Sequence, residues 1–188
     1  PDGSLEGPPP VSLAQAEAAR STLLRLLTID PSDRVAVDAL ERLAEESGDA
    51  ERLVEALERR VLAEPDDKKP DVLVRLARLH EERLGQVEHA LRCYEDARML
   101  APDRDEVALH LRRIYEATSR HTALAELLDE LAIRAPNDEM RFSLLRDRAR
   151  LLRDVMKEPA LAAEAYREMR TIREDDEALL SLLAQARK

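Results

Sequence analysis

A proline-and-acid turn recurs along this chain about every 35 residues. A proline just past a helix ends that helix, and an Asp or Asn behind it can cap the next one. The turns are centred on Pro31, Pro65, Pro102 and Pro136, and a proline-free version follows at Glu174. Their spacing is nearly constant. A fixed period of about 34–38 residues predicts a solenoid of stacked helices.

Each interval contains a second break, which divides it into two helices. The breaks fall at Gly48, at Gly85, near Ser119 and at Lys157-Glu158-Pro159. Apolar residues between the breaks follow helical spacing, as do Ala19, Leu23, Leu26 and Leu27 in the first segment. The pattern predicts helices over 12–29, 35–47, 50–63, 70–83, 87–100, 105–118, 121–134, 140–156, 160–172 and 177–187.

Composition narrows the class of protein. Charged residues make up 37% and aromatic residues only 2%, which suits an extended, thin core of Leu, Ala and Val. No stretch is long and uncharged enough to cross a membrane. The net charge of −10 argues against nucleic-acid binding through a broad basic surface. A single cysteine, Cys93, excludes an internal disulfide framework.

The first eleven residues differ from the rest. Residues 1–11 hold four of the ten prolines and two of the four glycines, so we expect a flexible linker or tail there and a helical solenoid over 12–188. The chain has no initiator Met and no signal peptide at its start, which indicates a segment of a longer protein. We expect a cytoplasmic location. The preference for Arg over Lys is typical of a bacterial protein with a GC-rich gene.

The intervals also alternate in length. Shifting the chain so that Leu73 falls on Leu145 also superposes Ala77, Ala90 and Tyr94 on Ala149, Ala162 and Tyr166. A shift shorter by one, which places Leu40 on Leu111, also superposes Leu53, Leu57 and Pro65 on Leu124, Leu128 and Pro136. The alternation suggests that a block of two units was duplicated.

The periodic set resembles the tetratricopeptide repeat (TPR), a helix–turn–helix of about 34 residues. Its packing positions 4, 7, 8, 11, 20, 24, 27 and 32 correspond in the second unit to Leu73, Leu76, Ala77, His80, Ala90, Tyr94, Ala97 and Pro102. That unit has one extra residue between its helices. Glu41 and Arg60 in the first unit, and Arg148 and Met169 in the fourth, depart from the usual residue types. These departures leave open a related helical-hairpin repeat of different curvature.

The resemblance implies an all-α, right-handed superhelical solenoid of antiparallel helix pairs. It would contain about four full repeats and a half-repeat at each end. Proteins of this family are mostly non-enzymatic scaffolds whose first helices line a concave groove that binds a partner peptide or helix. We therefore expect no enzyme activity and no cofactor.

The resemblance also implies which residues line the groove. Position 9 of the first helices holds an arginine in every full unit, and position 12 is acidic in three of them. With the basic residues of the last unit, the expected groove residues are Arg42, Arg78, Arg113, Arg146, Arg150, Arg153, Glu45, Glu81 and Glu116. Arginine forks suit carboxylates, so one hypothesis is an acidic peptide or a terminal carboxylate on Arg113, Arg150 and Arg153. The alternative is that each arginine pairs with the glutamate three residues on.

Other reactive side chains give no catalytic or metal-binding pattern. The four histidines lack metal-ligand spacing, and we expect His80, Tyr94, Tyr115 and Tyr166 to pack in the core. Cys93 is expected to be an unreactive thiol. Phe142 is a candidate exposed anchor near the groove.

Three function classes remain open. The first is a groove-binding adaptor. The second is a structural spacer or oligomerisation segment of a larger repeat protein, which would self-associate through its open ends at Leu179, Leu180, Leu182 and Leu183. The third is a regulatory arm of an enzyme or transcription factor.

Overall fold

A computed structural model describes residues 12–173 together with Leu179, Ser181 and Leu183. The chain divides into two compact units of several helices each, and each is described by itself. From here on the first unit is residues 1–107, the second unit is residues 108–188, and a single helix pair is called a repeat. The expected tail over 1–11 lies outside the described residues. So does most of the expected helix over 177–187, of which only the helical positions 179, 181 and 183 are described.

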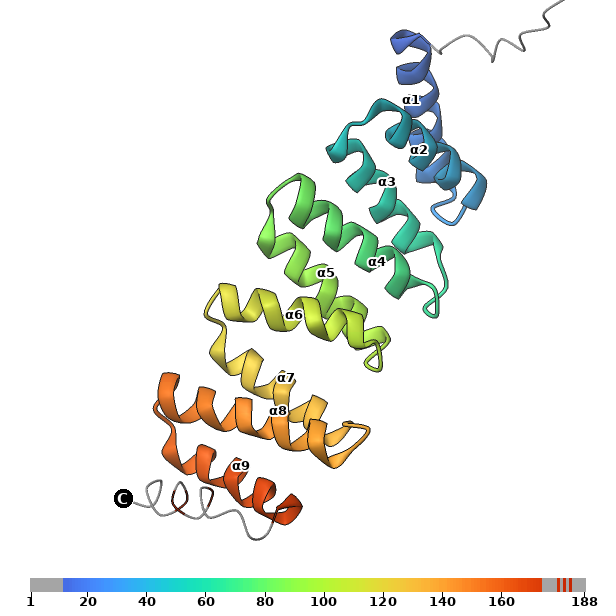
Figure 1. Cartoon of the computed structure of the whole chain (residues 1–188). Helices are drawn as coiled ribbons and strands as arrows, with labels where there is room; N and C mark the ends of the chain where they lie inside the picture. Colours follow the sequence, from blue (N-terminus) through green and yellow to red (C-terminus); the bar gives the residue numbers. More distant parts are fainter. Residues whose placement is uncertain (1–11, 174–178, 180, 182, 184–188) are drawn as a thin grey trace, which may run out of the picture. The chain divides into compact units, whose positions relative to one another are not determined.

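Helices alternate with short turns along both units (Figure 1). The first unit contains α1 to α5, and α6 spans the boundary between the units. The elements are α1 (Leu13–Ile29), α2 (Arg34–Ser47), α3 (Ala50–Ala63), α4 (Lys69–Arg78), η1 (Leu79–Arg83), α5 (Val87–Leu100), α6 (Asp105–Ala117), α7 (His121–Ile133), α8 (Asp138–Arg150), η2 (Leu151–Val155) and α9 (Pro159–Ile172). The described residues contain no strand, which confirms the all-α class.

The nine helices predicted between residues 12 and 172 are confirmed with small shifts at their ends, but two of them are not α-helical throughout. The segments expected over 70–83 and 140–156 both end in a π-helical turn, η1 and η2. In these two repeats the first packing positions of the two helices are one residue further apart than in the others. The pairs are Leu73 and Ala90, and Leu145 and Ala162, against Val37 and Leu53, and Ala108 and Leu124. Because a π-turn accommodates one extra residue within a helix, the extra residue expected between the helices lies inside the first helix.

Side-chain caps begin several helices where the sequence places Asp, Asn or Ser. Asp33 Oδ1 accepts hydrogen bonds from the backbone N–H groups of Val35 and Ala36 at 3.0 and 3.1 Å. Asn137 accepts one from Met140 at 2.8 Å. These bonds satisfy N–H groups that a helix cannot pair internally. The prediction is confirmed for the turns after Pro31 and Pro136. It is wrong after Pro65, where α4 begins after Lys68 with no side-chain cap.

All four predicted breaks contain a residue in the left-handed conformation. The φ angles are 66° at Gly48, 65° at Gly85, 56° at Ser119 and 60° at Lys157. This conformation ends a helix and reverses the chain, and it is adopted without strain only by glycine. The same backbone turn is therefore present with or without glycine.

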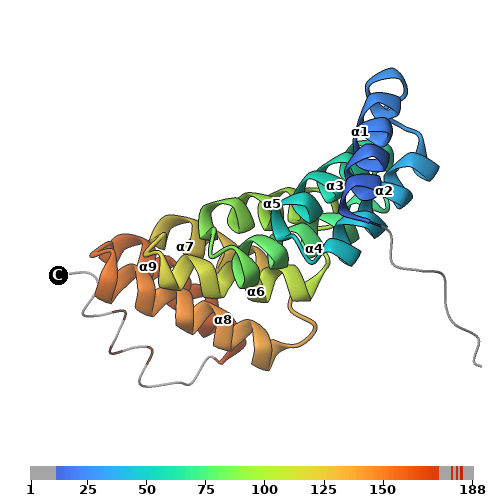
Figure 2. The ribbon, with the colours of Figure 1, turned by 90° about the horizontal axis from the view of Figure 1, so that it is seen from above.

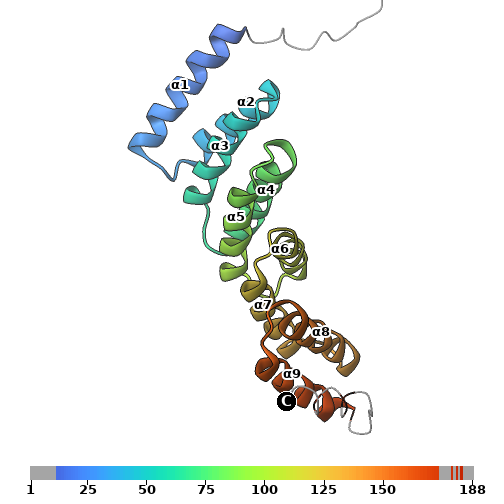
Figure 3. The same ribbon diagram turned by 90° about the vertical axis from the view of Figure 1, so that its left-hand side faces the viewer.

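The core of the first unit lies between consecutive helices. Leu27 of α1 packs in a cluster with the buried face of α2, which includes Val37 and Leu40. A second cluster joins Leu57 of α3 to Leu76 of α4. In Figure 3, α1 lies alongside α2, with which it is in contact.

One core cluster of the second unit is built mainly from α8, η2 and α9. It contains Leu145, Ala149, Leu152, Ala162 and Tyr166. Figures 1 and 2 show α7, α8 and α9 side by side, as their contacts require. The four residues expected in the core are buried, which confirms their packing roles: Tyr94, Tyr115, Tyr166 and His80.

Two expectations about exposed apolar residues are wrong. Phe142, the candidate anchor, is only 6% exposed and lies under the Arg173 guanidinium, whose carbon is 4.0 Å from the ring centroid. Leu179 and Leu183 are 3% and 7% exposed because they pack into the core of the second unit. They are not available for contact with another chain. Leu180 and Leu182 lie outside the described residues.

The charged residues at family packing positions find partners. Glu41 and Arg60 form an ion pair with each other, and Arg75 Nη2 lies 2.7 Å from Glu41 Oε1. In the second unit, Arg148 Nη1 lies 2.9 Å from Asp129 Oδ1. A buried charge is tolerated when it is paired. The departures from the family pattern are therefore compensated.

Candidate functional site: the exposed faces of the first helices

The first helix of each repeat buries one face and exposes the opposite one. In α4, Leu73, Leu76 and Ala77 are buried, whereas Arg78 is 45% exposed. The pattern follows from apolar residues at helical spacing with arginines between them. The predicted groove residues lie on these exposed faces, except that Glu81 and Arg153 are half-buried.

In the first unit, the predicted residues take part in ion pairs. Arg42 is 73% exposed, and its Nε lies 3.8 Å from Glu46 Oε1. Arg78 pairs with Glu106 at the start of α6. Glu45 Oε1 lies 3.3 Å from Arg75 Nη2. Glu81 is half-buried in η1.

In the second unit, the predicted residues lie on α6 and on α8–η2. Arg113 and Glu116 are exposed on α6, where Glu116 accepts a 3.0 Å hydrogen bond from Arg112. Arg146 donates to Ser143 Oγ at 3.2 Å. Arg153 forms two bonds with the Asp154 carboxylate, of 2.6 and 2.9 Å. Arg150 is exposed.

The alternative pairing with the glutamate three residues on does not describe the ion pairs of Arg42 and Arg78. Arg42 pairs with the residue four positions on, and Arg78 pairs across to another helix. Glu45 and Glu116 likewise pair with Arg75 and Arg112.

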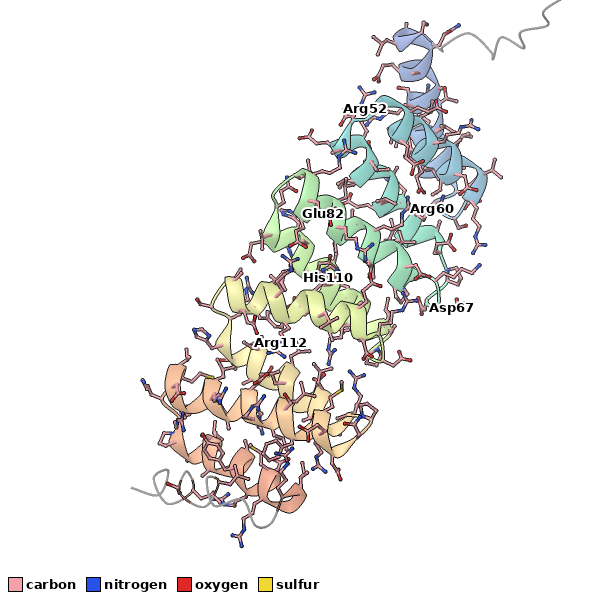
Figure 4. All side chains as sticks on the ribbon, in the orientation of Figure 1. Arg52, Arg60, Asp67, Glu82, His110 and Arg112 are labelled. Carbon is pink, nitrogen blue, oxygen red and sulfur yellow. The ribbon has the colours of Figure 1, made fainter. Side chains whose placement is uncertain are left out.

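A set of ion pairs that the sequence reasoning missed joins residues about one repeat apart. Arg112 Nη2 lies 2.9 Å from Asp147 Oδ2, and Arg104 Nη1 lies 2.5 Å from Asp71 Oδ1. Figure 4 labels Arg112 among the side chains of α6. Further pairs of this spacing are Arg20–Glu55, Arg52–Glu17, Arg75–Glu41 and Arg173–Glu139. A search for opposite charges one period apart would have found them.

These ion pairs change the acidity of their members. Burial lowers the pKa of Arg112, but its hydrogen bonds to Glu116 and Asp147 outweigh burial and raise it. The hydrogen bond from Arg153 lowers the pKa of Asp154. Both groups therefore stay charged around neutral pH.

Two further titratable side chains, His80 and Cys93, have defined surroundings. His80 Nδ1 lies 2.8 Å from Gln86 Oε1, and its ring stacks on His89 with centroids 5.1 Å apart. Burial, followed by Asp96 and Glu58, raises the pKa of Cys93 to about 11. The thiol is thus protonated at neutral pH. No three His, Cys, Asp or Glu side chains of the described residues converge on a metal position.

Two hollows in the first unit open between helices. One of about 280 Å³ lies between α1 and α2 and is lined by Leu13, Ala16, Leu40 and Leu43. The other, of about 220 Å³, lies between α3 and α4–η1, with Arg75, Arg78 and Arg83 at its edge. Both are smaller than a typical small-molecule site of ~300–1,000 Å³. Within the described part of the chain, no helix is long and apolar enough to span a membrane.

Sequence comparisons do not assign the chain to a family. No family model matches it, and no curated protein matches it. Among solved structures, MamA AMB-1 is similar at 18% identity, over 91% of this chain and 86% of that one, with a TM-score of 0.39.

Two further solved structures are similar at comparable levels. The thermophilic TPR protein TTC0263 of Thermus thermophilus has 21% identity over 93% of this chain and 91% of its own, with a TM-score of 0.34. The TPR-like repeats of a Podospora anserina kinesin light chain have 18% identity over 88% and 90%, with a TM-score of 0.43. The repeated helix pairs and their punctuated turns give this chain a TPR-like helical-repeat fold.

Proposed function

We propose that the chain is a non-enzymatic protein-interaction scaffold that binds a partner peptide or helix in a concave groove lined by its first helices. One observation carries the proposal. At position 9 of each full repeat, which falls on α2, α4, α6 and α8, an arginine is exposed between buried packing residues, namely Arg42, Arg78, Arg113 and Arg150. Four equivalent positions with the same side chain give a partner a repeated point of contact.

A crosslinking scan tests the proposal. A benzophenone side chain would be introduced singly at Arg42, Arg78, Arg113 and Arg150. Matched controls would carry it at exposed positions of the second helices, Arg92, Glu126 and Arg167. In the native organism, one partner should crosslink to the first-helix positions and not to the controls. Equal crosslinking from both sets would contradict a groove on the first helices.

Self-association is a second candidate, and a different observation favours it. Leu13 and Ile29, the first and last residues of α1, are 85% and 83% exposed, so each end of that helix presents an apolar side chain to solvent. Light scattering over a range of concentrations would reveal a dimer, and Leu13→Glu with Ile29→Glu should dissociate it. A mass that stays monomeric at all concentrations would exclude this candidate.

A further inference from the structure

Four cations lie at helical spacing along the first helix of the fourth repeat. Arg146, Arg150, Arg153 and Lys157, here called the basic stripe, are separated by four, three and four residues. In an α-helix that spacing brings side chains to one face, as for Arg146 and Arg150 on α8, whereas Arg153 lies in the π-turn η2 and Lys157 beyond it. The stripe runs along α8 and η2 and ends at the left-handed turn residue Lys157.

Much of the charge on the basic stripe is not neutralised by neighbouring side chains. Among the described residues, no side chain forms an ion pair or hydrogen bond with Arg150 or Lys157, although the charges of both lower the pKa of nearby Asp154. Arg146 has only the 3.2 Å bond to Ser143 and an Asp147 oxygen at 4.0 Å. Arg153 is paired with Asp154 at the helix surface. Unpaired guanidinium groups at exposed positions can take up anionic ligand groups without losing an internal partner.

Arg150 and Arg153 both act electrostatically on the same buried group. Burial raises the pKa of Tyr166 on α9, and Arg153 and Arg150 both oppose that rise through their charge. Tyr166 is packed in the core, so its position is fixed. Both guanidinium groups therefore act on a fixed core residue, where the charge of Asp154 acts in the opposite sense.

The second repeat has the same backbone without the stripe. Superposing Leu73 on Leu145 makes Val74, Arg78, Glu81 and Gly85 its corresponding residues. Only one of the four is basic, and Arg78 is already paired with Glu106. The packing frame therefore does not require cations at these positions.

The two units also differ in net charge, and the second unit, which contains the basic stripe, is the less acidic one. Residues 1–107 contain 25 acidic and 15 basic residues, whereas residues 108–188 contain 15 of each. All of the excess negative charge lies in the first unit. A long polyanion such as nucleic acid would be repelled by the chain as a whole, whereas a short acidic segment could engage the stripe alone.

We infer that the basic stripe binds a short acidic segment of a partner protein. This inference rests on the proposed scaffold function and names the partner chemistry at one of its repeats. The ten helical residues over 146–155 cover about 15 Å, which an extended peptide spans with roughly five residues. Alternating carboxylates in such a peptide recur about every 7 Å, close to the spacing of successive cations on the helix face. Arginine forks bind carboxylates through paired hydrogen bonds.

Fluorescence anisotropy with a defined probe tests the inference. The probe is a labelled peptide of four consecutive Glu–Ser pairs, titrated with the full chain at low and physiological salt. We expect saturable binding that weakens with salt, and no binding of the matching Gln–Ser or Lys–Ser peptides. Arg150→Glu with Arg153→Glu should weaken binding about tenfold or more.

A matched variant controls for net charge. Arg167→Glu with Arg170→Glu makes the same charge change at exposed positions of α9 and should alter affinity less than about twofold. Circular dichroism should show equal helicity in both variants. Equal loss in both, or no loss in either, would overturn the inference. Tighter binding of a single-stranded oligonucleotide of equal charge would also overturn it.

The inference and the proposed function fail in different ways. If the acidic probe does not bind while crosslinks still form on the first helices, the stripe assignment is wrong and the scaffold proposal stands. If no first-helix position crosslinks to a partner, the scaffold proposal fails as well.

Discussion

The second and fourth repeats share a backbone and differ in the surface they present. Both contain a π-turn at the end of the first helix, a left-handed residue in the turn, and a buried tyrosine on the second helix. Matching positions outside the shared packing set differ. Val74 is buried and Glu81 is acidic in the second repeat, whereas Arg146 is exposed and Arg153 is basic in the fourth. Packing fixes the inward residues because a core tolerates little change in volume. The outward residues are free to determine binding.

The comparison is tested most strongly by removing the buried tyrosines. Tyr94→Ala and Tyr166→Ala should each destabilise the chain by about 3–5 kcal/mol, because a large fully packed side chain is lost. Urea unfolding followed by circular dichroism measures the effect. If the losses of stability differ widely between the two variants, the tyrosines do not have equivalent packing roles in the two repeats.

The first repeat sharpens the comparison with an ionic core. Glu41 and Arg60 occupy the positions that Ala77 and Ala97 occupy in the second repeat. They pair with each other, and Arg60 is labelled in Figure 4. Glu41→Ala should cost about 1–3 kcal/mol, because Arg60 and Arg75 lose an acceptor. Adding Arg60→Ala should recover part of that loss in the same urea assay. Strictly additive losses would mean that the two residues do not act as a pair.

Substitutions at the turn residues should change the free energy of unfolding by a smaller amount, and in opposite directions in the two repeats. Gly85 and Lys157 both have a positive φ near 60°, and a methyl group at Gly85 would meet no atom within 4 Å. Gly85→Ala should therefore cost about 1 kcal/mol through backbone strain alone, and Lys157→Gly should gain up to about 1 kcal/mol. Unfolding midpoints measure both. A destabilised Lys157→Gly would show that the lysine side chain supports the turn.

The outward arginines should have the smallest effect on stability. Arg150→Ala should change the free energy of unfolding by less than about 0.5 kcal/mol, because its side chain is exposed and forms no ion pair with a described residue. Arg78→Ala removes an exposed pair with Glu106 and should cost up to about 1 kcal/mol. A large loss of stability in Arg150→Ala would show that this side chain contributes to the packing of the repeat.

Local signals in the sequence were sufficient to predict the fold. Prolines, acidic caps and helical spacing located the helices, because these features act over a few residues. The π-turns were not predicted, since the extra residue could equally have lain in the turn. Phe142 was misassigned because its cover, Arg173, is distant in sequence.

The candidate site was predicted less completely, because its charges pair across helices. Position 9 was enough to place Arg42, Arg78, Arg113 and Arg150 on exposed faces. The partners of Arg78 and Glu45 lie in other repeats, and no local rule names them. Lys157 was not predicted as a site residue. It could be added to the basic stripe only because the structure shows that η2 ends at Val155, two residues before it.

The π-turns bear on how such a chain can change length during evolution. Each π-turn accommodates a one-residue insertion inside the first helix. The left-handed turn and the second helix that follow keep their usual form. Deleting one residue there should convert the turn to ordinary α-helix and restore the shorter helix-to-helix spacing of the neighbouring repeats. Helix pairs of the two spacings can therefore be interconverted by a single insertion or deletion, and the gap in an alignment belongs within the helix rather than in the loop.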